Sequence, residues 1–220
     1  MVADSMQAGV GENLGRGFVA VSAADGVYLS WRLLPQDPLD LAFNVYRQEE
    51  GSPPERINTE PVTRTTDCLD ASAQAGMSCR YVLKSVRGSV EVEEAALATT
   101  VPEESEGLPF LRIPLKGDYA AQKVALGDLD GDGELEFVIK QPNFNTDPYQ
   151  HPGYWKRSED TYKIEAYKLD GRLLWRYDMG WAIEEGIWYS PYVVYDLDGD
   201  GCAEVYVKAG EGDPGTPMGA

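Results

Sequence analysis

Short stretches of apolar, β-branched and aromatic residues, separated by polar turns, occupy the first hundred residues of the chain. Pairs typical of turns, such as Asp25-Gly26 and Arg87-Gly88, separate them, and no apolar pattern of helical period competes. We expect strands at FVAVSA (18–23), VYLSWRLL (27–34), LAFNVYRQ (41–48), CRYVLKSV (79–86) and VEVEEAALAT (90–99). Short strands at such regular spacing predict a β-sandwich over residues 18–100, preceded by an N-terminal extension over 1–17.

The pattern changes after VPEESEG, a polar, proline-containing stretch that we interpret as a linker over residues 101–107. From residue 108 to residue 220 the chain contains strand–turn–strand units. We place them at LPFLRIPL (108–115), KVALGDLDGDGELEFVIK (123–140), YKIEAYKLDGRLLWRYDMG (162–180) and PYVVYDLDGDGCAEVYVK (191–208). Repeated hairpins are typical of the blades of a β-propeller. A ring needs about four to eight four-stranded blades, so residues 108–220 predict the first blades of an incomplete propeller.

One nine-residue loop occurs twice in this region. It is DLDGDGELE at 128–136 and DLDGDGCAE at 196–204, with seven of nine positions identical and an offset of 68 residues. An EF-hand would have a bidentate glutamate at loop position twelve, between two helices. Position twelve is Ile139 in one loop and Val207 in the other, each within a predicted strand, so the EF-hand interpretation fails.

Alternating carboxylates in a turn are ligands suited to Ca²⁺, which takes about six to eight oxygens in irregular geometry. Mg²⁺ fits less well because it keeps more of its waters, and a solvated acidic turn is the simpler alternative. The predicted ligands are the three aspartates, the main-chain carbonyl of position seven and the final glutamate of each loop. These are Asp128, Asp130, Asp132, Glu134 and Glu136 in the first loop, and Asp196, Asp198, Asp200, Cys202 and Glu204 in the second.

Composition narrows the classes of partner. The formal net charge of −18 and the sequence pI near 4.3 disfavour nucleic acid and anionic membranes as partners. The chain shows neither an apolar run of transmembrane length nor a signal peptide at its start. Cys68 and Cys79 either form a disulfide or are two small core residues, and their spacing leaves both open.

Two further segments carry aromatic and polar side chains. QPNFNTDPYQHPGYWKRSED (141–160) is long for a loop in a compact repeat, and its amides, aromatics and lysine suit a saccharide. WAIEEGIWYSP (181–191) is similar in composition. The alternatives are an ordinary surface loop and an ordered connection between blades. With the single histidine, His151, and no triad, phosphate-loop or zinc pattern, the catalytic residues stay unknown.

Two resemblances are carried by these residues. Trp31, Tyr46 and Tyr81 are similar to the core residues of fibronectin type III domains, and we expect all three to pack in the sandwich core. The motifs of about residues 14–213 resemble the N-terminal third of rhamnogalacturonan lyases of polysaccharide lyase family 11. They are GRGFVAVSAADGVYLSWRLL, FNVYR, VALGDLDGDGELEFVIK, IEAYKLDGRLLWRYDMG and YDLDGDGCAEVYVK.

The second resemblance implies a fibronectin-III-like β-sandwich followed by a calcium-binding β-propeller, in an all-β chain. It implies β-elimination in the backbone of rhamnogalacturonan I, a pectic polysaccharide, in an extracellular or periplasmic setting. It also implies that catalytic residues lie in later blades, so this chain alone is expected to be inactive. By the same resemblance Asn143, Asn145 and Asp147 are candidates for substrate binding.

Other functions stay open beside this one. The main alternative is a calcium-dependent carbohydrate- or protein-binding module of the adhesion type, without catalysis. A further possibility is a cytoplasmic structural protein that keeps the repeats only for folding. An incomplete propeller also leaves strand edges exposed, and these favour self-association.

Overall fold

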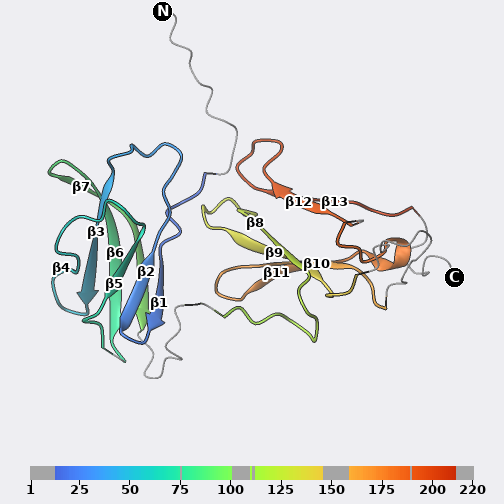
Figure 1. Cartoon of the computed structure of the whole chain (residues 1–220), viewed down its shortest axis with the longest axis horizontal. Coiled ribbons are helices and arrows are strands. Elements are labelled where there is room, and N and C mark those ends of the chain that lie inside the picture. The colour runs from blue at the N-terminus through green and yellow to red at the C-terminus, as the bar shows by residue number, and fades with distance from the viewer. Residues whose placement is uncertain are drawn as a thin grey trace, which may run out of the picture. The chain divides into compact units, whose positions relative to one another are not determined.

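The computed structural model describes residues 13–74, 76–100, 110, 112–145, 159–188 and 190–211. The chain divides into two compact units, one formed by Leu14–Arg112 and the other including Ile113–Ala220 (Figure 1). All regular structure in the described residues is β-strand except a single turn of 3-10 helix at Gly180–Ala182, so the predicted all-β class is confirmed. The described residues contain no helical segment that could span a lipid bilayer.

The first unit contains two antiparallel sheets. One sheet has the order β1-β2-β5, and its strands are β1 (Val19–Ala23), β2 (Gly26–Ser30) and β5 (Asp67–Asp70). The other has the order β4-β3-β6-β7, with β4 (Glu55–Arg56), β3 (Ala42–Glu49), β6 (Ser78–Arg87) and β7 (Val90–Thr100). The five predicted strands are therefore present, while β4 and β5 were not predicted.

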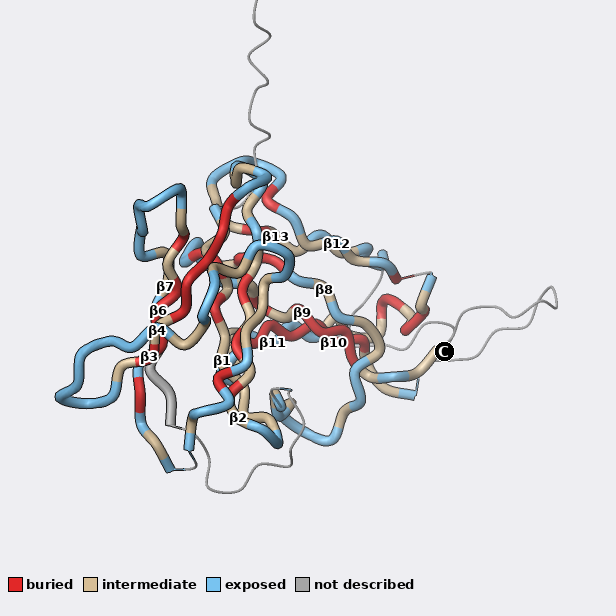
Figure 2. The backbone as a smooth tube through the Cα atoms, turned by 60° about the vertical axis from the view of Figure 1, so that its left-hand side comes forward, coloured by how far each residue is buried: buried red, intermediate tan, exposed pale blue. Residues whose placement is uncertain are grey.

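Alternation along the strands builds one core between these sheets. Val27 and Leu29 of β2 are buried against Val45 of β3 and Leu83 of β6, and Figure 2 shows buried backbone along β3 and β6. Trp31 packs on Phe43 with ring centroids 5.3 Å apart. The unit is thus a β-sandwich, as the strand pattern predicts.

Of the three aromatic residues predicted to lie in the sandwich core, two are buried there. Trp31 and Tyr81 are 4% and 0% exposed. Tyr46 is not a core residue, because its neighbour Val45 points inward and successive side chains of a strand point to opposite faces. Its hydroxyl donates to Glu91 at 2.8 Å, and Lys84 lies over its ring.

The cysteines of this unit are free thiols. Cys79 is buried in the core cluster and Cys68 packs against it. The open question from the sequence is answered in favour of two small core residues, and burial raises the pKa of both thiols.

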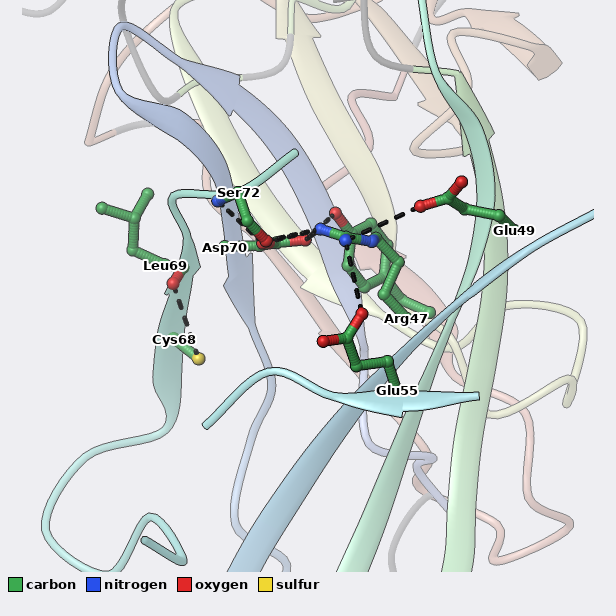
Figure 3. Close-up of polar contacts among 8 residues, drawn as sticks. Arg47, Glu49, Glu55, Cys68, Leu69, Asp70 and Ser72 are labelled. Carbon is green, nitrogen blue, oxygen red and sulfur yellow. Dashed lines mark hydrogen bonds and ion pairs between the residues drawn. The ribbon is translucent and has the colours of Figure 1, made fainter. Parts of the chain in front are cut away.

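A buried ion pair joins the two sheets near one end of the core (Figure 3). The guanidinium of Arg47 on β3 donates to both oxygens of Asp70 on β5, at 3.0 and 2.8 Å. Asp70 also accepts from the hydroxyls of Ser72, at 2.7 Å, and Tyr81, at 2.8 Å. Because the charges are paired and hydrogen-bonded, the sandwich tolerates them below its surface.

The second unit begins with a four-stranded antiparallel meander. Its strands are β8 (Lys123–Gly127), β9 (Glu136–Gln141), β10 (Lys163–Tyr167) and β11 (Leu173–Asp178). A separate hairpin follows, formed by β12 (Tyr192–Tyr195) and β13 (Glu204–Val207). The unit predicted at 108–115 is wrong, since its described residues form no strand.

The hairpin packs its inward side chains onto one face of the meander. Val138, Tyr162, Ile164 and Ile183 form the buried centre of this second core. The residues packed against it from the hairpin are Tyr192, Val194, Val205 and Val207. The Tyr192 hydroxyl also donates to the Val138 carbonyl at 3.0 Å, so apolar and polar contacts fix the hairpin on the meander.

Candidate metal centre

The two acidic loops fold in the same way because glycine stands at the same positions. Gly131 and Gly133 have φ of 75° and 87°, and their counterparts Gly199 and Gly201 have φ of 80° and 96°. Residues with a Cβ adopt this left-handed region at a cost. The DGDG sequence therefore lets each loop turn tightly between its two strands, with every second residue an aspartate.

The first aspartate of each loop is held by backbone amides. Asp128 accepts from the amides of Gly131 at 2.7 Å and Gly133 at 2.8 Å. Asp196 accepts from the amides of Gly199 at 2.7 Å and Gly201 at 3.1 Å. These bonds fix the loop around a buried carboxylate.

The final glutamate of each loop closes the turn in the same manner. Glu136 accepts from the amide of Leu129 at 2.7 Å, and Glu204 accepts from the amide of Leu197 at 3.0 Å. The two loops therefore share their hydrogen bonds as well as their sequence. In each loop the final glutamate lies close to the first aspartate.

Carboxylates converge at both loops. In the second, one oxygen each from Asp196, Asp198, Asp200 and Glu204 lie within 4.8 Å of one another. In the first, Asp128, Asp130 and Glu136 meet the same limit. Hard oxygen donors gathered in this way fit a divalent cation, and the two clusters can hold a metal ion.

A lysine from another strand distinguishes the first loop. The ammonium of Lys168, just after β10, lies 2.8 Å from Asp130, 2.6 Å from Asp132 and 3.2 Å from Glu136. Its hydrogen bonds to Asp130 and Asp132 raise its pKa. A cationic group is thus stable among these carboxylates. Among the described residues, no ion pair reaches the carboxylates of the second loop.

The two loops also contact each other. The amide of Ala203 donates to the carbonyl of Asp128 at 2.6 Å. A Cβ added at Gly131 would lie 3.0 Å from the sulfur of Cys202, so glycine is needed there for close approach as well as for its φ. The predicted carbonyl ligands of Glu134 and Cys202 lie in these same turns, where their amides donate to Asp132 and Asp200. Their role as ligands stays a prediction.

Only part of the predicted substrate loop lies in the described residues. Asn143 is exposed, and the carboxamide oxygen of Asn145 accepts from the amide of Ile187 at 3.2 Å. Asp147 and His151 lie outside the described residues. Asn145 therefore helps to hold the segment after the 3-10 helix.

Two lysines secure that same segment, and the sequence analysis did not single them out. Lys123 of β8 donates to the carbonyl of Ile187 at 2.7 Å and lies over the ring of Trp188. Lys140 of β9, fully buried, donates to the carbonyls of Gly186 and Ser190. Residues 183–188 are in this respect an ordered connection, which is one of the interpretations raised from the sequence for this segment.

Glu185 in this connection is buried, and its pKa is raised to about 8. Loss of solvation is the main cause, and Asp160 and Glu184 add to it, while Lys163 and Lys140 act in the opposite direction. A carboxyl group whose pKa is higher in the folded state binds its proton more tightly there. Stability is therefore expected to fall as pH rises from near the unfolded pKa of Glu185 through about 8.

Replacing Glu185 with Gln should remove this part of the pH dependence. Thermal unfolding measured from pH 5 to pH 9, roughly the span of the two pKa values, should show a flatter profile for Glu185→Gln, with the gain at the alkaline end. Glu211→Gln, at an exposed residue of the same unit, is the control. Parallel profiles for wild type and Glu185→Gln would show that Glu185 does not titrate in this range.

Two family models match the chain, one in each unit. The model described as Rhamnogalacturonan I lyases beta-sheet domain matches residues 10–101. The model described as Rhamnogalacturonan lyase family 11, C-terminal domain, matches residues 114–218.

Characterised relatives and solved structures agree with this match. The chain is 35% identical to the rhamnogalacturonan endolyase YesW of Bacillus subtilis over 213 residues, which are 91% of this chain and 32% of YesW. It is also 35% identical to the exolyase YesX of the same organism, with the same coverage of both chains. The chain thus spans about a third of the length of these relatives.

Solved structures of rhamnogalacturonan lyases match the chain over a similar share of their length. The crystal structure of YesW superposes with a TM-score of 0.72 at 32% identity, covering 94% of this chain and 36% of YesW. A rhamnogalacturonan lyase of family 11 from Bacillus licheniformis gives 0.71 at 32% identity, covering 90% and 33%. From its two matched domains, its relatives and its fold, the chain belongs to rhamnogalacturonan lyase family 11.

Proposed function

We propose that the protein acts in the cleavage of rhamnogalacturonan I, the pectic polysaccharide, by β-elimination. The observation that carries this proposal is the match of both units, at residues 10–101 and 114–218, to domains of rhamnogalacturonan lyases. The relatives named as endolyase and exolyase support the reaction class, and they leave open which of the two modes this chain would serve.

The reaction removes the proton at C5 of the galacturonate, next to its carboxylate, and breaks the bond between C4 and the glycosidic oxygen. The electrons of the C–H bond form the C4=C5 double bond, and the leaving oxygen takes a proton. A base is needed at C5, together with positive charge near the carboxylate. We assign neither role to a residue of this chain, so its contribution is the scaffold.

We propose Ca²⁺ as the ion of the two acidic loops. Four converging carboxylates in the second loop and three in the first support a cation that takes many oxygen ligands. Bound there, Ca²⁺ would supply positive charge that offsets the repulsion within each turn. This chain's own residues, the amide-held Asp128 and Asp196, position the remaining carboxylates around it.

We propose further that the second unit is part of a β-propeller and the first a fibronectin-III-like domain. The meander β8–β11 has the four strands of a propeller blade. The hairpin β12–β13 packs on the face of this meander, as the first two strands of a following blade would. The strand orders β1-β2-β5 and β4-β3-β6-β7 support the fibronectin-III-like assignment. An extracellular or periplasmic site of action is part of the same proposal, since that is where pectin is met.

An activity assay tests the lyase proposal. Rhamnogalacturonan I is incubated with the 220-residue chain and, separately, with the chain extended to the full length of its relatives. We expect unsaturated uronate, followed by its ultraviolet absorbance, only from the extended protein. Activity of the 220-residue chain itself would contradict our placing of the chemistry outside it. Binding of the polysaccharide without any product from either protein would favour the alternative, a calcium-dependent binding module.

A further inference from the structure

The side chain of Lys168 enters the first acidic loop from the turn between β10 and β11. Its ammonium lies 2.8, 2.6 and 3.2 Å from carboxylate oxygens of Asp130, Asp132 and Glu136. All three carboxylates belong to the ligand set predicted for Ca²⁺ in this loop. The lysine side chain is 13% exposed, so it is largely buried against the loop that it enters. A cationic group of the chain itself therefore stands where the metal ligands of the loop converge.

This ammonium and a metal ion would use the same oxygens. Ca²⁺ holds its oxygen ligands at about 2.3–2.6 Å. A charge-assisted bond from an ammonium to a carboxylate has a length of about 2.7–2.9 Å. A calcium ion bound by Asp130 and Glu136 would therefore lie very close to the ammonium of Lys168, where two positive charges repel strongly. The loop can hold one of the two cations at a time.

The shape of the loop does not depend on the lysine. Asp128 accepts hydrogen bonds from the amides of Gly131 and Gly133. Glu136 accepts from the amide of Leu129 through its Oε2 atom and faces the ammonium with its Oε1 atom. When the ammonium leaves, Oε1 becomes available to a metal ion while Oε2 keeps the turn closed. The remaining loop is thus already arranged for a cation.

The backbone of Lys168 is fixed independently of its side chain. Its amide donates to the carbonyl of Arg172 at 2.9 Å, and its carbonyl accepts from the amide of Gly171 at 3.0 Å. These two bonds close the turn between β10 and β11. Because a lysine has a flexible four-carbon side chain, the ammonium can leave the loop by side-chain rotation alone. The pairing of β10 with its neighbours need not change.

We propose that Lys168 is a built-in counter-cation of the first acidic loop, which neutralises the carboxylates in the absence of metal and is displaced when Ca²⁺ binds. The lysine thereby stabilises the metal-free loop and weakens its affinity for the ion, because binding must first break the ion pairs of the ammonium. The inference rests on the proposed binding of Ca²⁺ to this loop and is independent of lyase activity. It requires that removal of the ammonium has two opposite effects, lower stability without metal and tighter binding of Ca²⁺.

Isothermal titration with Ca²⁺ tests the displacement in a chain whose second loop has been disabled. The parent protein carries Asp196→Asn/Glu204→Gln, so that the first loop is the acidic loop left to titrate. Adding Lys168→Met should tighten Ca²⁺ binding roughly tenfold, the effect of losing a few partly exposed ion pairs. The same variant without metal should show a lower thermal transition of the second unit than the parent. Arg172→Met, at an exposed basic residue of the same turn, is the matched control and should change neither value.

The contrary results separate the displacement from the proposed ion. A lower metal-free transition with unchanged or weaker Ca²⁺ binding would show that Lys168 is only a structural residue, and an unchanged metal-free transition would show that it does not neutralise the loop. Either result overturns the displacement and leaves Ca²⁺ in place. If neither the folded parent nor folded Lys168→Met binds Ca²⁺, the proposed ion of this loop fails together with the displacement. Should Lys168→Met lack a thermal transition of the second unit, Lys168→Gln replaces it.

Discussion

Chelation of divalent cations is expected to lower the thermal stability of the unit that carries the acidic loops and to leave the sandwich unchanged. In the second loop four carboxylate oxygens lie within 4.8 Å of one another, and without a cation their repulsion opposes folding. In the first loop three lie within the same distance, and Lys168 offsets part of their repulsion. A ligand at 100 times its dissociation constant stabilises the folded state by about 2.7 kcal/mol. Two occupied loops would together contribute about 5 kcal/mol.

Calorimetry with excess Ca²⁺ and with excess chelator measures this effect. We expect two transitions, of which only that of the second unit moves to lower temperature on chelation. Asp196→Asn should reduce the shift because it removes the carboxylate on which the second loop is built. Asp25→Asn, at an exposed turn of the sandwich, should leave it as in the wild type. Equal transitions with and without metal would contradict metal binding to the folded loops.

Replacing Asp70 with Ala is expected to destabilise the sandwich by about 3–5 kcal/mol, the usual effect of leaving one member of a buried ion pair unpaired. The guanidinium of Arg47, 8% exposed, would lose the bonds of 2.8 and 3.0 Å shown in Figure 3. The hydroxyl of Tyr81 would lose its acceptor as well. The other carboxylates near Arg47, those of Glu49 and Glu55, lie 3.7 and 3.8 Å from it and are too exposed to compensate.

Denaturant unfolding at neutral pH measures the loss, with Glu49→Ala as control. That change removes only a solvent-screened ion pair, so its cost should stay below about 1 kcal/mol. In calorimetry, Asp70→Ala should move the transition of the sandwich alone, which also assigns the two transitions in the chelation experiment. A cost for Asp70→Ala equal to that of Glu49→Ala would show that the buried pair contributes nothing.

The Asp70 contribution should also depend on pH. Burial by itself would raise the pKa of Asp70, but the hydrogen bonds from Ser72, Tyr81 and Arg47 outweigh it and lower the pKa. A lowered pKa in the folded state means that the contribution is present above the unfolded pKa and is lost as pH falls through the acidic range. The difference between wild type and Asp70→Ala should therefore shrink toward acid.

The sequence predicted those parts of the fold that local pattern determines. Strands such as β3 and β6 are predicted by the two-residue alternation of their apolar side chains. The tight acidic turns are predicted by their glycines, which adopt the positive φ that these turns require. The short strand Glu55–Arg56 was missed because both its residues are charged and exposed, and its pairing comes from β3. The unit predicted at 108–115 forms no strand in its described residues, where no neighbouring strand pairs with it and Pro114 has no amide to donate.

The candidate site was predicted in its loop residues and missed in its long-range partner. Spacing identifies the carboxylates, since all lie within nine residues of one another. Lys168 belongs to it only because β10 pairs with β9 so that Tyr167 lies opposite Phe137, which brings the next residue beside Glu136. The register between β9 and β10 is set by long-range strand pairing, and the sequence around Lys168 alone does not predict it. Asn145 was singled out for substrate, yet its observed bond is to the backbone of Ile187.

The number of calcium ions bound per chain tests the central claim most directly. Equilibrium dialysis of the wild type against Ca²⁺ should give two ions per chain, one for each acidic loop. The double variant Asp196→Asn/Glu204→Gln should give one, while retaining the sandwich transition in calorimetry. Two ions bound to the double variant, or none bound to the folded wild type, would contradict the assignment of these loops as the metal sites of the repeat.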